Sequence, residues 1–272
     1  MSLNNDILVS VVVPLYNYQS FIGDCIQSIL NQTYYNLELI VVDDRSIDKS
    51  YKVAKKFEDK DSRVKVIRLD RNRGYSTAKN EAIVRSSGEY IITLDADDMM
   101  TTTSVEDRLK ATIDYCVPFV YADAIKIVGN ISLQKCYGLD HDNVKKVVRI
   151  PPNKPKFIYD PSNGIHNIHA QTVMIHREVF KQYGLFDENL RSRSDREMWW
   201  RLFGKDDSEK PKIDSYYLNS PVAYYRSHYN SMWKKRKRDP VLDQKVINMS
   251  EDAYNRRKKD GINRKNTRFL EK

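Results

Sequence analysis

Short apolar runs alternate with amphipathic segments along the first hundred residues. The run 9–13 is rich in β-branched residues and stops at Pro14, and similar runs cover 37–43, 64–69 and 90–94. Such runs are typical of buried strands. The segments between them repeat apolar residues every three or four positions, as a helix with one buried face does. This alternation predicts right-handed crossovers and an α/β fold with a mostly parallel, Rossmann-like sheet flanked by helices.

Two local signals set the expected element boundaries. Ser46 follows the second strand and is expected to cap the next helix, because a serine hydroxyl accepts a hydrogen bond from a free N–H of the first turn. Gly74 is expected to separate the third strand from a helix that contains Ala78 and Ala82.

Carboxylates stand at the ends of two of these strands. Asp43 and Asp44 close the second apolar run, and Asp95, Asp97 and Asp98 follow the fourth. A single acidic turn is common on protein surfaces. Two strands that both end this way predict one shared site, because ligands of parallel sheets bind at the carboxyl ends of the strands. Such oxygen ligands suit a hard divalent cation and the phosphates that it carries.

The phosphate-binding loops of two large enzyme classes are missing. No Gly-x-Gly-x-x-Gly follows the first strand, and no glycine-rich loop ending in Gly-Lys-Ser or Gly-Lys-Thr occurs. A nucleotide would therefore be held by a metal and by side chains. This disfavours a dehydrogenase or a P-loop NTPase and fits a nucleotide diphosphate donor.

Composition and charge predict where in the cell the protein is located and mark a second, basic region of the chain. No apolar stretch approaches the roughly 18 to 20 residues that cross a bilayer, and three unclustered cysteines favour a reducing compartment. We therefore expect a soluble, cytoplasmic protein. The net charge of +9 is concentrated in residues 233–272, which carry +8. This tail is expected to form a basic helix that associates peripherally with an anionic surface, although a solvated helix face is the more common case.

Several motifs in order resemble family 2 glycosyltransferases of the GT-A fold, which are inverting and metal-dependent. The resemblance rests on residues 11–17, 41–48, 72–80 and 94–98, and further on residues 194–202 and 225–228. The chain departs from the family pattern at Ser194 (usually Glu), Arg45 (usually Gly) and Lys79 (usually Arg). The resemblance implies a hexosyltransferase with a GT-A domain over 1–232 and the basic helical tail over 233–272. Within the domain, 1–100 would bind the nucleotide and 101–232 the acceptor.

The resemblance also implies a metal site of the Asp-x-Asp (DXD) type. Asp97 and His228 would hold Mn²⁺ or Mg²⁺, and Asp95 would contact the ribose or a water on the metal. By spacing alone, the commoner interpretation of His228 is a surface histidine beside Tyr229. A divalent ion between the two phosphates stabilises the departing diphosphate, so that no second carboxylic acid is required, in contrast to a glycosidase.

The first half would bind a UDP-sugar. Tyr16 would lie against the pyrimidine, with a core position as the alternative, and Asp43 would accept the imide proton of uracil. Asn72 and Lys79 would complete the base and phosphate contacts, although Lys79 could instead be a solvated helix residue. The further donor-binding residues expected from the motifs are Pro14, Asn17, Asp44, Asp95 and Ala96.

Asp195 is the expected general base. Its segment predicts a helix that presents one carboxylate at its start while Met198, Trp199 and Leu202 pack inward. The alternative is a carboxylate that only stabilises a helix N-terminus. With a base on the face opposite the leaving group, transfer would be a single inverting displacement.

The acceptor half is less defined. The proline-rich segment 137–162 is expected to form a hairpin or loop over the cleft, and acceptor specificity is expected there and in His166, His169 and Gln171. The acceptor would be a glycan, a lipid-linked sugar or another hydroxyl compound. Zinc binding by these histidines and His176 is disfavoured, because no cysteine partner or helical histidine pair occurs.

Two other function classes remain open from the sequence. A metal-dependent nucleotidyltransferase shares the sheet and the metal, but it would more often carry a glycine-rich, basic loop after the first strand. A noncatalytic polyanion-binding protein would need only the tail, and neither Asp97 nor Asp195. The tail is expected to dock by an apolar stripe and to turn its Lys and Arg outward, with all the chemistry upstream. The stripe comprises Val241, Leu242, Val246, Ile247, Met249 and Tyr254.

Overall fold

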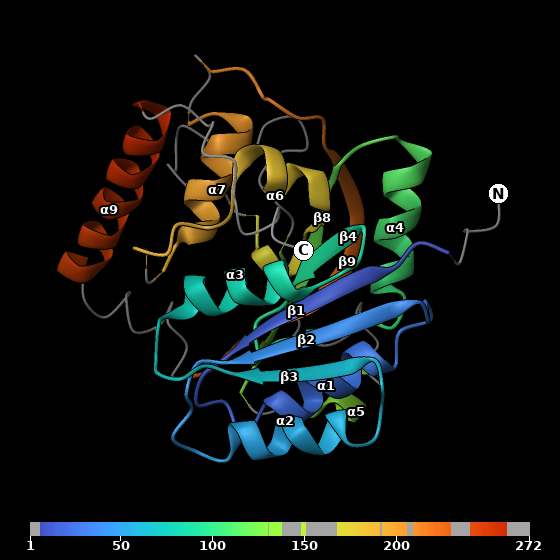
Figure 1. The fold of residues 1–272 in the computed structure, drawn as a ribbon. Coiled ribbons are helices and arrows are strands. Elements are labelled where there is room, and N and C mark those ends of the chain that lie inside the picture. Colours follow the sequence, from blue (N-terminus) through green and yellow to red (C-terminus); the bar gives the residue numbers. More distant parts are fainter. Residues whose placement is uncertain are drawn as a thin grey trace.

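The computed structural model describes residues 6–129, 131–137, 148–150, 168–190, 192–205, 209–229 and 240–259 (Figure 1). The strands are β1 (Val9–Leu15), β2 (Leu37–Asp43), β3 (Val64–Arg68), β4 (Tyr90–Thr93), β5 (Met99–Met100), β6 (Phe119–Val128), β7 (Val148–Ile150), β8 (Met174–His176) and β9 (Tyr216–Ser227). The helices are α1 (Ile22–Leu30), α2 (Ser50–Glu58), α3 (Tyr75–Arg85), α4 (Ser104–Asp114), α5 (Leu133–Tyr137), α6 (Arg177–Tyr183), α7 (Ser194–Phe203) and α9 (Pro240–Lys259), with a 3₁₀ turn, η1, at Ala170–Thr172.

All the described strands belong to one sheet. Its order is β3-β2-β1-β4-β8-β6-β9-β5, and β7 pairs with β6 outside this path. The strands β3, β2, β1 and β4 are parallel, which confirms the mostly parallel sheet expected for the first hundred residues. The second half is mixed, because β8 runs antiparallel to both β4 and β6 while β9 runs parallel to β6. The α/β fold is therefore as expected, and the antiparallel pairs involve the strands from β5 onward.

The parallel half is buried on both faces. Alternate residues of β1 explain this, because Val11 and Val13 pack with α1 in one core cluster while Val12 packs with α3 in another. Figure 1 shows α1 and α2 on one side of the sheet and α3 on the other. Strands covered on both faces are expected to be apolar throughout, which is the pattern of 9–13 and 37–43.

Two boundary predictions are wrong. Pro14 does not stop β1, which continues to Leu15 with Pro14 paired to Val42. The pairing of β1 with β4 ends at Val12. At Pro14 no strand therefore lies on that side to accept the backbone N–H that proline lacks. Ser46 does not cap α2. The side chain of Asp48 accepts the Ser50 N–H at 2.9 Å instead, and the Ser46 hydroxyl accepts the backbone N–H of Asn17.

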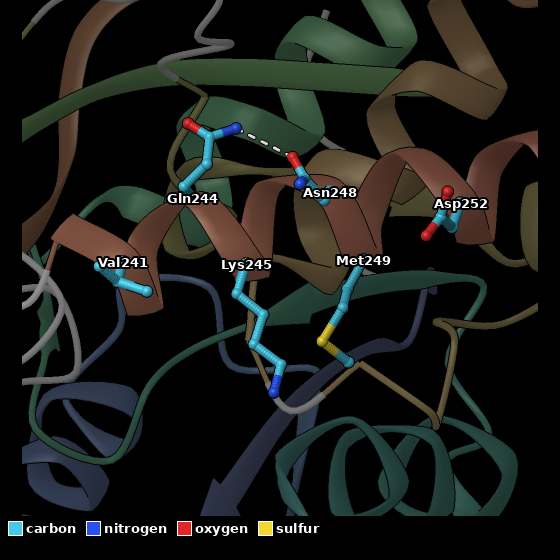
Figure 2. A pocket seen from close by; sticks show the side chains of 6 residues that line it. All are labelled: Val241, Gln244, Lys245, Asn248, Met249 and Asp252. Carbon is cyan, nitrogen blue, oxygen red and sulfur yellow. Dashed lines mark hydrogen bonds between the residues drawn. The ribbon is translucent and has the colours of Figure 1, made fainter.

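The tail forms the helix α9, which packs beside α7 (Figure 1). The expected docking stripe is only partly correct. Tyr254 is buried, but Val241 is 80% exposed and Met249 is 38% exposed. Figure 2 shows these two side chains with Lys245 projecting from α9, where they line part of a pocket of about 650 Å³. The basic run 234–238, the side chain of Leu242 and most of the segment 137–162 lie outside the described residues.

No helix in the described ranges combines the length and the apolar character that a membrane span requires.

Gly88, just before β4, lies very close to the backbone of the first strand segment, at Leu8 and Ser10. A Cβ there would lie 2.6 Å from the backbone nitrogen of Ser10 and 2.8 Å from the carbonyl oxygen of Leu8. We expect Gly88→Ala to destabilise the protein by about 2 kcal/mol, because forced overpacking against rigid groups typically costs 1 to 3 kcal/mol. Chemical denaturation measures the change in the free energy of unfolding.

Gly23→Ala is the matched control. A Cβ at Gly23 meets only one side-chain atom, at 3.9 Å, and the residue lies in α1, where alanine is the better helix former. This variant should be neutral or slightly stabilised. Equal stabilities of the two variants would contradict the packing at Gly88.

Candidate active site

The carboxyl ends of β1, β2 and β4 bring the first group of predicted residues together. Leu15 is paired with Asp43 in the sheet, and Val12 is paired with Thr93, so the loops after these strands meet at one edge. Pro14 is buried within β1, and Tyr16 immediately after the strand is 42% exposed. The core alternative for Tyr16 is therefore excluded, and its ring is open to a ligand.

Asn17 ties the loop after β1 to the loop after β2. Its backbone is left-handed, with φ of 57°, a conformation that asparagine tolerates better than most residues. Its side-chain oxygen accepts the N–H of Ile47 at 2.9 Å, and its own N–H bonds to Ser46 at 3.0 Å. Asn17 thereby holds the exposed Tyr16 ring beside the end of β2.

Asp43 and Asp44 have different surroundings. Asp43 is fully buried, and its carboxylate pairs with Arg68 at 3.1 Å and accepts the Ser46 N–H. Asp44 accepts the backbone N–H groups of Arg73 at 2.6 Å and Gly74 at 2.8 Å. Burial raises the pKa of Asp44, and these two backbone hydrogen bonds oppose the rise.

The contacts of Asp44 place the start of α3. The side-chain amide of Asn72 donates to the Asp44 carbonyl at 3.2 Å, and Gly74 has a φ of 96°. This backbone conformation suits glycine and admits a sharp entry into the helix. Asn72 is thus positioned at the same edge of the sheet as Tyr16 and Asp43.

Lys79 is fully buried, so the solvated-residue alternative is wrong. Its ammonium lies over the ring of Tyr75 at 4.3 Å and the ring of Phe186 at 4.6 Å, and it has no hydrogen-bond partner within the described part of the chain. Burial lowers the pKa of Lys79, while the carboxylates of Asp95 and Asp195 oppose this effect. A buried cation without a hydrogen-bond acceptor is unfavourable, and a nearby anion would offset this cost.

The acidic turn after β4 forms a compact cluster. Oxygen atoms of Asp95, Asp97 and Asp98 lie within 4.8 Å of one another, and Ala96 between them is buried. The Tyr75 hydroxyl donates to Asp95. Burial raises the pKa of Asp98, with further increases from the charges of Asp97 and Asp95. One oxygen of Asp98 is buried and has no hydrogen-bond partner among the residues that the structure describes.

His228 lies against this cluster. Its Nε2 is 2.9 Å from Asp97 Oδ2, and its side chain is 10% exposed, so the surface-histidine alternative is wrong. Phe21 lies 4.8 Å from the imidazole, ring to ring, and Tyr18 lies 6.1 Å away while also hydrogen bonding to Asp97. The pairing of β5 with β9 brings the end of β9 back to the acidic turn.

Arg226 contributes a contact that sequence reasoning missed. Its backbone N–H donates to Asp98 at 2.7 Å, and its guanidinium donates to the Asp97 carbonyl at 2.8 Å. The side chain is fully buried and also lies 5.0 Å from the Phe21 ring. It therefore fixes the acidic turn relative to His228. An arginine two positions before the expected metal ligand was the available signal.

The cluster fits a divalent cation. Three carboxylates and one imidazole are an oxygen-rich donor set of the kind that Mn²⁺ and Mg²⁺ use. Burial, and then the charges of neighbouring carboxylates, raise the pKa values of Asp95 and Asp98, and a bound cation would oppose both effects and give the free Asp98 oxygen a partner. Within the described residues, this triplet is also the only group of three or more His, Cys, Asp or Glu side chains close enough for a metal.

Asp195 reaches the same site from the second half of the chain. It is the second residue of α7 and is partly exposed, while Met198, Trp199 and Leu202 are buried as expected. One carboxylate oxygen accepts the N–H of Arg196 at 2.9 Å. The charge of Asp195 acts on the pKa values of Tyr75, Lys79, Asp95 and His169, which places it among these groups.

The other histidines have separate surroundings. His169 lies 5.1 Å from the Tyr225 ring, and burial lowers its pKa against an opposing effect of Asp195. Gln171 is buried on η1, and His166 lies outside the described residues. His176 caps α6 by accepting the Glu178 N–H at 3.2 Å. His176 is thus engaged as a helix cap.

Comparisons with known proteins agree with this geometry. The family model described as glycosyl transferase family 2 matches residues 10–184. TuaG of Bacillus subtilis (strain 168), whose name assigns it to teichuronic acid biosynthesis, is 31% identical over 235 residues, which cover 85% of each chain. The Escherichia coli protein WfaP, named a UDP-Glc:alpha-D-GlcNAc-diphosphoundecaprenol beta-1,3-glucosyltransferase, is 26% identical and covers 88% of this chain and 85% of its own.

Solved structures support the fold. TarS 1–349 of S. aureus, in complex with UDP-GlcNAc, superposes with a TM-score of 0.64 at 18% identity. The match covers 83% of this chain and 60% of the TarS chain. The mixed sheet and its flanking helices are thus those of a GT-A fold, and the matched family model spans more than half of the chain. The chain belongs to glycosyl transferase family 2 and is a glycosyltransferase.

Proposed function

We propose that this glycosyltransferase moves a sugar from a UDP-sugar to an acceptor hydroxyl, with inversion at the anomeric carbon and with a divalent metal. The observation that carries the proposal is the cluster of Asp95, Asp97 and Asp98 with His228 at 2.9 Å, facing a site that Asp195 also reaches. The WfaP name includes UDP-Glc, and the TarS complex contains UDP-GlcNAc, which supports a UDP-sugar donor.

The uracil would be recognised at the end of β2. Tyr16 offers an exposed ring for stacking, and Asp43 would accept the imide N–H. Asp43 already contacts Arg68 and Ser46, but a carboxylate has about four lone-pair sites and can accept further hydrogen bonds. Cytosine carries an acceptor where uracil carries this donor, so the pairing would favour uracil. Asn17, Asp44 and Asn72 would shape the loops around the base.

Asp97 and His228 would hold Mn²⁺ or Mg²⁺, and Asp95 would lie toward the ribose or a water on the metal. When bound, such an ion supplies Lewis-acid stabilisation to the diphosphate leaving group. Arg226 and Tyr18 orient Asp97 for this role through the contacts described above. Lys79, a buried cation near Asp95 and Asp195, would add positive charge on the donor side.

Asp195 would take the proton from the attacking hydroxyl. Its position at the start of α7 leaves its carboxylate partly exposed at the site. The acceptor hydroxyl would then displace the diphosphate directly, with no covalent intermediate. A single displacement inverts the configuration of the transferred sugar.

The acceptor would bind on the side of His169, Gln171 and Tyr225, near Asp195. The WfaP name specifies a diphosphoundecaprenol-linked GlcNAc acceptor, which supports a glycan or lipid-linked acceptor for this chain as well. The +8 charge of residues 233–272 would favour a cytoplasmic enzyme held peripherally at an anionic membrane surface.

Donor hydrolysis tests the proposed function. A panel of UDP-sugars is incubated with the protein and Mn²⁺, and both the thermal unfolding temperature and the release of free sugar are followed. We expect at least one UDP-sugar to stabilise the protein in a metal-dependent manner and to be hydrolysed slowly. Production of pyrophosphate from UTP and a sugar phosphate, with no UDP-sugar hydrolysis, would instead indicate a nucleotidyltransferase.

A further inference from the structure

A buried charge network lies behind the proposed base, on the same helix. Glu197 of α7 is fully buried, and its carboxylate is 2.7 Å from the Arg201 guanidinium one turn later. The same guanidinium donates to the Leu185 carbonyl at 2.8 Å and to the Gly184 carbonyl at 3.3 Å. The carbonyl oxygens after α6 and the Glu197 carboxylate thus form an electronegative pocket behind the first turns of α7.

The tail helix inserts a second guanidinium into this pocket. Arg257 of α9 donates to the Leu185 carbonyl at 3.0 Å, and its Nε lies 3.6 Å from Asp187 and 4.0 Å from Glu197. Its side chain is 32% exposed, so it points inward, against the expectation that the basic residues of the tail face solvent. Figure 1 shows α9 beside α7, although the two helices are well separated in the sequence.

Other contacts fix α9 in this position. Tyr254 is buried one turn before Arg257 and lies 6.0 Å from the Trp200 ring, edge to face. Lys205 pairs with Glu251 at 3.2 Å. The helix is therefore held at several points along α7, and the inward direction of Arg257 follows from this docking.

The loop that Arg257 contacts also supports the donor side. The side-chain amide of Asn80 on α3 donates to the Phe186 carbonyl at 2.9 Å, and the Ser76 hydroxyl donates to the Leu190 carbonyl. Phe186 in turn covers the ammonium of Lys79 at 4.6 Å. Arg257 thus joins the helix that carries Asp195 to the loop that holds α3 and Lys79.

We propose that Arg257 is a positioning residue for Asp195, and that α9 is therefore part of the catalytic fold. Glu197 lies two residues after Asp195 in the first turns of α7, and a buried carboxylate needs compensating positive charge to stay in place. Two guanidiniums supply it here, one from α7 and one from α9. This inference rests on the proposed role of Asp195 and replaces the expectation that the chemistry lies wholly upstream of residue 233.

The test compares Arg257→Gln with Lys258→Gln in the full chain. Glutamine at 257 keeps most of the side-chain length and an amide donor for the Leu185 carbonyl but removes the charge next to Glu197 and Asp187. Lys258 is the adjacent residue, 61% exposed and paired with Glu209 at the surface, so it controls for loss of charge on α9. UDP-sugar hydrolysis with Mn²⁺ gives kcat and KM, and hydrogen exchange reports on the first turn of α7.

We expect Arg257→Gln to lower kcat about tenfold with KM for the donor unchanged within twofold, since displacing a catalytic group by a fraction of an ångström has effects of this order. Amides 195–198 should exchange faster while those of α3 do not. Lys258→Gln should match the wild type in both measurements. Arg257→Ala, which also removes the contact with Leu185, should show the same kcat effect.

Three results would overturn the inference. Equal kcat for Arg257→Gln and Lys258→Gln would remove the positioning role. A parallel fall in kcat and donor affinity with general destabilisation would make Arg257 a purely structural residue, and unchanged exchange at 195–198 would break the link to α7. Absence of hydrolysis in the wild type would count against the proposed function alone, because the exchange comparison still tests the coupling of α9 to α7.

Discussion

Replacing Asp195 with asparagine is expected to reduce sugar transfer and donor hydrolysis by about 10² to 10⁴ fold, the usual effect of removing a general base. Asparagine keeps the size of the side chain and its hydrogen bond to the Arg196 N–H, but it cannot accept the proton of the attacking hydroxyl. The buried face of α7, with Met198 and Trp199, is unaffected. UDP affinity, measured by calorimetry with Mn²⁺, should therefore match the wild type.

Asp114→Asn is the control for the same chemical change. Asp114 ends α4, is exposed, and makes none of the site contacts described above. It should leave turnover unchanged. Near-native turnover by Asp195→Asn, with matched UDP affinity, would assign the base to another residue, and His169 beside Tyr225 would be the next to test.

Removing the divalent metal is expected to weaken UDP binding by at least about a hundredfold. Without the ion, the diphosphate would face the carboxylates of Asp95, Asp97 and Asp98 with no compensating positive charge, and a hundredfold loss of affinity needs only about 2.8 kcal/mol of this repulsion. The chain has no glycine-rich phosphate loop to compensate. Calorimetric titration of UDP in the presence of Mn²⁺, and again with excess EDTA, measures the difference.

Asp97→Asn should reproduce most of this loss in the presence of Mn²⁺, because the amide keeps the shape but removes the charge that His228 and Tyr18 now contact. Asp114→Asn again serves as the control. Equal UDP affinity with and without EDTA would remove the metal from the donor site. A normal metal response in Asp97→Asn would transfer the ligand role to Asp95 or Asp98, whose oxygens lie within the same 4.8 Å cluster.

The local sequence was sufficient for the parallel half of the sheet. The apolar runs at β1 and β2 have no polar face, and the strands are covered on both sides, as parallel strands must be. Boundaries were less certain, because they depend on neighbours. Whether Pro14 ends a strand depends on how far β4 extends beside it, and whether Ser46 caps a helix depends on which groups Asn17 and Asp48 offer.

Among the site residues, too, some could be identified from the sequence and others could not. The acidic residues of the turn after β4 were identifiable, since carboxylates at a strand end have a chemical meaning wherever the sheet places them. The partners that orient them were not. Arg226 and Tyr18 contact Asp97 from more than fifty residues away along the chain. Lys79 was identifiable as a candidate, but its burial against the distant Phe186 was not, because a buried cation is indistinguishable from a solvated one in a sequence.

By itself, the sequence determined the alternation of strands and helices, the acidic strand ends and the concentration of positive charge in the last forty residues. Those features depend on periodicity and composition, which are local. Only the tertiary structure decided that His228 meets Asp97, that Asp195 acts on the groups around Lys79, and that Arg257 turns inward to Glu197. These contacts depend on how distant elements pack, because burial and the nearest charge of a side chain are set by its neighbours in space.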